Sequence, residues 1–90
     1  MSNVNEDPTN RAQRYIGIIT RTLEKQKIRA AGHQVQPENV KKIFDTINRY
    51  IDDAQHYLNS GRGTTALASV AYAEGLLDAL KFLELSETIT

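Results

Sequence analysis

Two short stretches containing glycine divide this chain into three segments of similar length. The first combines Gly32, which stops a helix, with Pro37, which suits the first turn of the next one. The second places Gly61 where a left-handed helix cap is needed and Thr64 where the next helix can be N-capped. In all three segments the apolar residues recur at helical spacing, and no segment shows the period-two alternation of a strand. The sequence therefore predicts an all-α fold, a three-helix antiparallel bundle. We expect the helices at residues 8–30, 37–60 and 64–85.

We expect one helical-bundle domain over residues 8–85, with a disordered N-terminus over residues 1–7 and a frayed C-terminus over residues 86–90. A chain of 90 residues buries only about 60–70% of its unfolded surface, so the core is thin and a second chain would thicken it. The absence of cysteine excludes disulfides and thiolate zinc sites. The apolar runs are far shorter than the roughly 20 residues that span a bilayer, and the polar start lacks a signal-peptide core. We therefore expect a cytoplasmic protein that does not associate with membranes.

The third segment is apolar or small around about 260° of a helical wheel, and three charged residues form a narrow polar strip. Its large residues lie on one side: Val70, Tyr72, Leu76, Leu77, Leu80 and Leu83. On another side lies a small-residue strip: Ala68, Ala71, Gly75 and Ala79, with Phe82 at its end. A glycine inside a helix costs about 1 kcal/mol relative to alanine, so Gly75 predicts close approach by another backbone. We expect the small-residue strip to form the interface of a homodimer or larger assembly.

Charge is distributed unevenly, although eleven basic residues balance eleven acidic ones. Residues 8–30 hold six basic side chains and one acidic side chain. On the wheel, an apolar stripe in this segment lies opposite a cationic stripe that can track a phosphate backbone. The candidate nucleic-acid contacts are Arg11, Arg14, Arg21, Lys25 and Arg29. No aromatic residue lies within the stripe for base stacking, so the alternative is a solvated face or one neutralised by acidic residues of a neighbouring helix or subunit.

Glu74 and Asp78 lie one turn apart on the polar strip and, with Asp53, form a candidate polar site. Paired carboxylates can hold Mg²⁺ or act as acid and base. The metal sites of helical bundles, however, use a Glu-x-x-His motif that this chain lacks. We therefore expect surface charges here, with no metal and no cofactor. Lys81, and across the predicted hairpin Arg49 or Lys42, are the candidate counter-ions.

Arg49 and His56 resemble the loose R-x6-H motif of HEPN-type ribonucleases, which are also helical bundles. Such a pair could stabilise and protonate groups around a scissile phosphate. The spacing arises by chance in many sequences, and Tyr50 does not fit the polar residue that usually follows the arginine of that motif. Ribonuclease activity is therefore the weakest alternative, and we expect no catalytic residues and no enzyme.

The second and third segments carry a more specific pattern. The string YIDDAQHYL from Tyr50 to Leu58 is followed by Gly61 and by AYAEGLLDALKFL from Ala71 to Leu83. Over roughly residues 37–85 this pattern resembles the archaeal domain-of-unknown-function family 357. The resemblance implies a small helical bundle without an assigned activity. The leading interpretation is a non-enzymatic bundle that associates with itself or with a protein partner through its helices, and RNA or DNA binding is the alternative.

Overall fold

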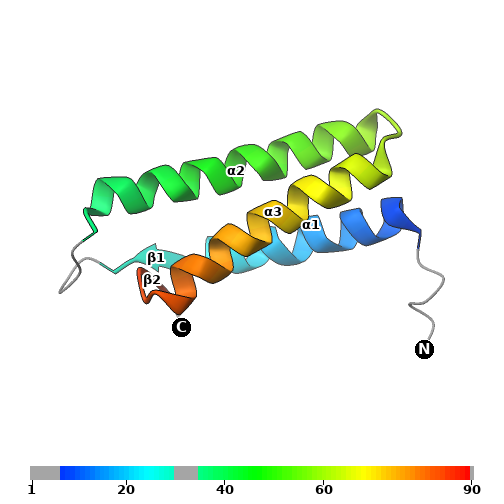
Figure 1. The fold of residues 1–90 in the computed structure, drawn as a ribbon. Helices are drawn as coiled ribbons and strands as arrows, with labels where there is room; N and C mark the ends of the chain where they lie inside the picture. The colour runs from blue at the N-terminus through cyan, green and yellow to red at the C-terminus, as the bar shows by residue number, and fades with distance from the viewer. Residues whose placement is uncertain (1–6, 30–34, 90) are drawn as a thin grey trace.

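A computed structural model describes residues 7–29 and 35–89, which form three helices and a short two-stranded ribbon (Figure 1). The elements are α1 (Pro8–Glu24), β1 (Gln26–Ile28), α2 (Pro37–Asn59), α3 (Gly63–Phe82) and β2 (Ser86–Thr88). α2 runs antiparallel to α3, and α1 and α3 run in the same direction (Figure 1). This up-down-up bundle confirms the predicted fold class.

The first helix begins with a side-chain cap and a proline in its first turn. The Asp7 carboxylate accepts the Asn10 backbone N–H at 2.8 Å, and Pro8 occupies the first turn, where its missing N–H is not needed. Pro37 takes the same place in α2. The sequence thus encodes both helix starts locally.

The turn between α2 and α3 confirms the predicted left-handed cap at Gly61, whose φ is 75°. The Arg62 N–H donates to the Tyr57 carbonyl at 2.8 Å, and the Gly61 N–H donates to the Leu58 carbonyl at 3.1 Å. This pair of bonds is a Schellman motif, which satisfies the last carbonyls of α2. The following helix begins at Gly63 and not after a Thr64 cap, because Arg62 is the N-cap residue.

The C-terminus of α3 closes with the same hydrogen bonds, although it has no glycine. Glu84 adopts a φ of 56°, the Leu85 N–H donates to the Leu80 carbonyl at 2.8 Å, and the Glu84 N–H donates to the Lys81 carbonyl at 3.0 Å. Leu85 is 4% exposed, so its side chain anchors the turn to the core. The helix therefore ends at Phe82, three residues before the predicted boundary.

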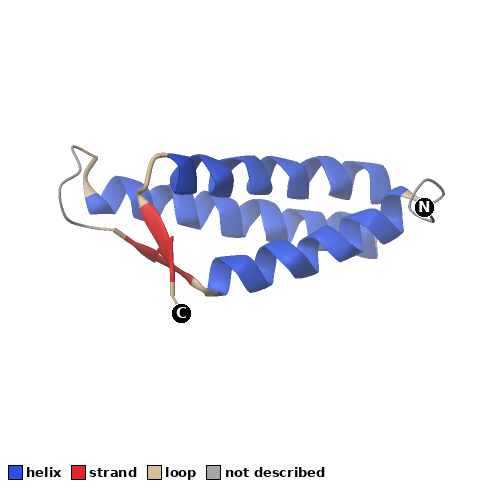
Figure 2. Cartoon of the chain, turned by 90° about the horizontal axis from the view of Figure 1, so that it is seen from below, coloured by secondary structure: helices blue, strands red, loops and turns tan. Residues whose placement is uncertain are grey.

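A ribbon of β1 and β2 replaces the predicted end of the first helix. α1 ends at Glu24, not at residue 30, and β1 forms a two-stranded ribbon with β2 (Figure 2). The strands are antiparallel, with Lys27 opposite Glu87. The predicted fraying of residues 86–90 is therefore wrong for Ser86–Thr88. Strands of three residues are too short to show a period-two pattern, and they pair across about 60 residues of sequence. Residues 1–6, expected to be disordered, and Gly32, expected to stop the first helix, lie outside the described residues.

Side-chain hydrogen bonds, in addition to backbone hydrogen bonds, hold the ribbon together. Ser86 is 5% exposed and donates its hydroxyl to Gln26 Oε1 at 3.0 Å, and Gln26 Nε2 donates to Thr88 Oγ1 at 2.9 Å. The Arg29 N–H donates to the Leu85 carbonyl at 3.0 Å. The chain after α3 is thereby fixed beside the end of α1.

The core lies between the three helices, and α3 packs against both of the others. Its buried apolar residues are Ala12, Ile16, Ile19, Val40, Ile47, Ile51, Ala54, Ala66, Val70, Ala73, Leu77, Leu80 and Leu85. At one end of the bundle the backbones of α1 and α3 come very close. A Cβ added to the buried Gly63 would lie 2.9 Å from both N and Cα of Thr9, so only glycine fits there.

Candidate functional site

The five residues of the small-residue strip lie on one exposed face of α3. We call this surface the α3 face and include the two large apolar residues beside the strip. Its members are Ala68, Ala71, Tyr72, Gly75, Ala79, Phe82 and Leu83, all of them exposed. Phe82 is 83% exposed, Leu83 64% and Tyr72 53%. Grouped exposed apolar residues of this size are typical of interaction surfaces.

The α3 face exists because only the opposite side of the helix is needed for the core. Ala66, Val70, Ala73, Leu77 and Leu80 recur every three or four residues and are all buried. The small-residue strip, which the sequence predicts to be an interface, is thus not covered by any other described part of the chain. The face opposite these five residues is open to solvent.

Two details of the α3 face differ from the sequence interpretation. Tyr72 is predicted on the side of the large residues and not beside the small-residue strip, but its ring stands edge-on to Tyr50 at 4.5 Å between centroids, at the border of the face. Leu83, from the same predicted group of large residues, is the exposed cap residue of α3. A Cβ added to Gly75 would meet nothing within 4 Å, so no described part of the chain makes the predicted close approach there.

The candidate polar site does not assemble within the described residues. Glu74 and Asp53 are exposed on different helices, and Asp78 is half-buried. Among residues 7–29 and 35–89, no three His, Asp or Glu side chains gather in a way that could hold a metal ion. The ion pairs that the described residues form with one another do not include Glu74 or Asp78. The two carboxylates therefore form an acidic edge along the α3 face.

Arg49 and His56 are both exposed on α2. At 1.5 Å per residue they stand about 10 Å apart along the helix axis. Neither residue lines the cavity of about 690 Å³ between α1 and α2. Both side chains of the R-x6-H spacing are therefore outside that cavity and open to solvent.

The structure interrupts the predicted cationic stripe. Arg11, Arg14 and Arg21 lie on α1, but Lys25 is its C-cap and Arg29 lies beyond β1. The Arg14 guanidinium carbon lies 4.9 Å from the Tyr15 ring centroid.

Two basic side chains at the ribbon pair with acidic residues. Arg29 Nη1 lies 3.8 Å from Glu84 Oε1, and Lys27 Nζ lies 3.3 Å from Glu87 Oε1. All four side chains are largely exposed, so each pair contributes little to stability. The pairs nevertheless reduce the net charge at this end of the stripe.

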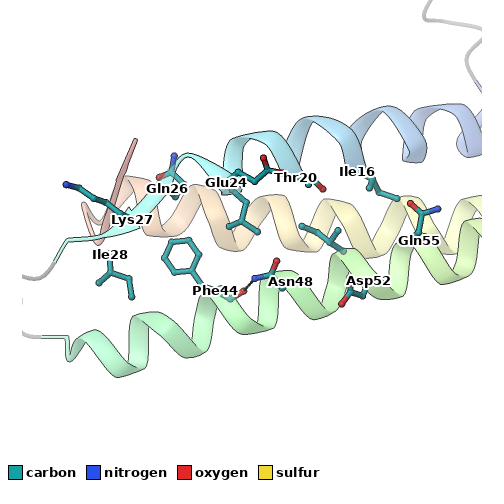
Figure 3. Close-up of a pocket in the computed structure, with 12 residues that line it drawn as sticks. Ile16, Thr20, Glu24, Gln26, Lys27, Ile28, Phe44, Asn48, Asp52 and Gln55 are labelled. Carbon is teal, nitrogen blue, oxygen red and sulfur yellow. Dashed lines mark hydrogen bonds between the residues drawn. The ribbon is translucent and has the colours of Figure 1, made fainter. Parts of the chain in front are cut away.

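A groove between α1 and α2 was not predicted from the sequence (Figure 3). Its volume is about 690 Å³, and its walls come from α1, β1 and α2. Residues such as Leu23 and Phe44 are half-buried and read as ordinary core positions on a helical wheel. A wheel describes one helix at a time, so it carries no signal for a gap between two helices.

The fold and these surfaces define a small three-helix bundle with an exposed apolar helix face. A family model described as "Protein of unknown function (DUF357)" matches residues 14–86, and the chain belongs to this family. The match confirms the resemblance seen in residues 37–85 and extends it to most of α1. No curated protein and no solved structure matches the chain. Among the described helices, none has both the length and the apolar character needed to cross a membrane.

Proposed function

We propose that this protein is a non-enzymatic bundle that acts through helix–helix association, and that its first association is a homodimer through the α3 face. The exposure of Phe82, at 83%, is the observation that carries the proposal. A large apolar ring held out from a helix, beside a strip of alanine and glycine, is favourable only when another surface covers it.

The spacing of the strip supports a two-fold antiparallel pairing centred on Gly75. Ala71 and Ala79 each lie four residues from Gly75, and Ala68 and Phe82 each lie seven residues from it. In an antiparallel pair of α3 helices, Phe82 therefore stands opposite Ala68 of the partner subunit. A large side chain over a small one is the complementarity that lets two helices approach closely. A closed two-fold interface of this kind is also the commonest form of homodimer.

The acidic edge gives the dimer a distinctive salt dependence. A two-fold axis between the helices brings the same edge of both copies to the same side. Glu74 and Asp78 of one subunit therefore lie near the same two residues of the other. Like charges across an interface oppose association, and salt screens them. We expect the dimer to strengthen as ionic strength rises.

The test is sedimentation equilibrium of the full chain from about 5 to 200 μM, a range that resolves micromolar dissociation constants. The wild-type chain is expected to dimerise. Gly75→Lys is expected to abolish dimerisation without unfolding the monomer, because a Cβ at this position meets nothing within 4 Å. Gln13→Lys, which adds the same charge at an exposed site on α1, is the matched control and leaves the dimer intact. A wild-type chain that stays monomeric throughout removes the proposal.

Nucleic-acid binding and ribonuclease activity stay predictions from the sequence, as do the cytoplasmic location and the archaeal source. The break in the cationic stripe after Glu24 weighs against the first. Retention on a polyanion column that is lost when Arg14, Arg21 and Lys25 are replaced by Glu would restore it.

A further inference from the structure

The groove between α1 and α2 is an apolar channel with a polar rim on the side of the bundle opposite the α3 face. Its floor consists of Ile16, Leu23, Ile28, Phe44 and Ile51. In Figure 3 the groove opens toward the viewer, with α1 above it and α2 below it. Both helices pack against α3, and the groove separates them on the opposite side. The three helices therefore leave apolar surface that a fourth element would cover.

The length and openness of the groove suit a helix. Along α2 the lining extends from Phe44 to Gln55, which is about 16 Å, or three helical turns. An apolar floor between two polar rims is the surface that receives side chains at i, i+3, i+4 and i+7 of an amphipathic helix. A helix placed here would complete a four-helix bundle, with α3 on the opposite side.

The charge on the rim specifies the helix further. Glu24 on α1 and Asp52 on α2 line the two sides of the groove and are exposed. Neither takes part in an ion pair formed within residues 7–29 and 35–89. The one basic residue in the lining, Lys27, lies 3.3 Å from Glu87 and is already paired. The groove therefore presents two uncompensated carboxylates, and a complementary occupant is cationic.

A second copy of the chain does not fit this description. The α3 face is flanked by Glu74 and Asp78, so placing it over Glu24 and Asp52 would bring like charges together. The two surfaces also point in opposite directions, so such a contact would build an open filament and not a closed dimer. The α3 face of a second copy is therefore excluded, and a helix with basic residues beside its apolar stripe fits instead.

We infer that the groove between α1 and α2 is a docking site for an amphipathic helix of a partner protein, with Lys or Arg on both sides of its apolar stripe. The inference is independent of the proposed dimer, because the two surfaces share no residue. It predicts that salt weakens docking, whereas salt strengthens the dimer.

The probe is a fluorescent 18-residue helix of Leu and Lys, with Leu at the i, i+3, i+4 and i+7 positions and about five turns long. Its matched control replaces every Lys by Glu. Binding to the full chain is followed by fluorescence anisotropy, and amide NMR shifts locate the site. We expect the Leu/Lys helix to bind with shifts in Leu23, Phe44 and Ile51, and the Leu/Glu helix to bind at least about tenfold more weakly.

Two double variants separate the groove from general acidity. Glu24→Gln with Asp52→Asn is expected to weaken binding about fivefold, since each exposed ion pair contributes modestly. Glu74→Gln with Asp78→Asn makes the same charge change on the opposite side and leaves binding unchanged. Glu24, Asp52 and Glu74 are exposed, and each amide keeps the shape of the carboxylate that it replaces, also at the half-buried Asp78, so both proteins fold.

Four outcomes of the peptide experiments overturn the inference. They are no binding of the Leu/Lys helix, equal binding of both helices, equal losses in both double variants, and shifts confined to the α3 face. A fifth outcome also overturns it: dodecylammonium changes the amide NMR shifts of the groove residues and the Leu/Lys helix does not. That result would assign the groove to a small cationic amphiphile.

Discussion

Gly63 and Gly75 lie on the same helix, about three turns apart, and face opposite surroundings. Gly63 is buried, and a Cβ added there would lie 2.9 Å from backbone atoms of Thr9. Gly75 is exposed, and a Cβ added there would meet nothing within 4 Å. The sequence predicts a close backbone approach at Gly75, but within the described chain the approach occurs at Gly63.

The comparison teaches that a helical glycine has no fixed meaning. Inside a helix it costs about 1 kcal/mol relative to alanine, but Gly63 is the first residue of α3, where that cost is small. Gly63 is required by the contact between α1 and α3, whereas Gly75 lies inside the helix and carries the cost. At Gly75 nothing in the monomer offsets it, so its cost is recovered only if a second chain covers the α3 face.

The largest effect is expected for Gly63→Ala. The added Cβ forces the start of α1 away from α3, and overpacking of this kind typically costs about 1–3 kcal/mol. We expect the upper part of that range, because backbone atoms of Thr9 and not a flexible side chain are in the way. Urea unfolding followed by circular dichroism at 222 nm measures the free energy of unfolding. Thr64→Ala, at the exposed neighbouring position, is the control and stays within about 0.5 kcal/mol of wild type.

Features that depend on residues close together in the sequence could be predicted. Pro8, Pro37 and the left-handed Gly61 fix helix boundaries through their own backbone preferences. The 3.6-residue period alone puts the small-residue strip on one face of α3. The strip lies on one exposed face of the described helix, and its role as an interface stays a prediction.

Features that depend on distant segments could not be predicted. The ribbon forms because Gln26–Ile28 meets Ser86–Thr88, and neither segment is strand-like by itself. The groove depends on the angle between α1 and α2, which no single-helix pattern contains. The left-handed conformation of Glu84 at the end of α3 could not be predicted, because glycine or asparagine is expected at such a position.

The second-largest effect is expected for Gly75→Ala, which should stabilise the monomer, whereas Gly63→Ala should destabilise it. The methyl group enters open space and the helix becomes easier to form, so the monomer should gain about 1 kcal/mol. Urea unfolding at about 2 μM, below the concentration range in which dimerisation is measured, reports on the monomer. Gly17→Ala is the matched control and should gain less, because its Cβ would lie 3.3 Å from Arg21 Nη1 and displace that guanidinium.

Gly75→Ala also tests the comparison through the dimer. A methyl group at the centre of the antiparallel contact holds the two backbones apart, so the monomer becomes more stable while the dimer becomes weaker. A variant that loses stability at 2 μM would mean that the monomer itself occupies this space, and Gly75 would then resemble Gly63.

The smallest effect is expected for Glu84→Gly, at a position whose left-handed backbone favours glycine. An L-residue in the left-handed region costs about 1–2 kcal/mol, and glycine avoids this strain but adds freedom to the unfolded chain. The substitution also removes the exposed Arg29–Glu84 pair, which at 3.8 Å contributes little. The net gain should be about 0.5 kcal/mol, read from the midpoint of urea unfolding.

The equivalent cap at Gly61 supplies the control, because Gly61→Ala introduces the strain that Glu84→Gly removes. It should destabilise by about 1 kcal/mol, so the two variants should shift the unfolding midpoint in opposite directions. A loss of stability in Glu84→Gly would show that the Glu84 side chain, and not the buried Leu85, fixes the end of α3. The entry into β2 would then depend on the Arg29 pair, and Arg29→Ala would release the ribbon.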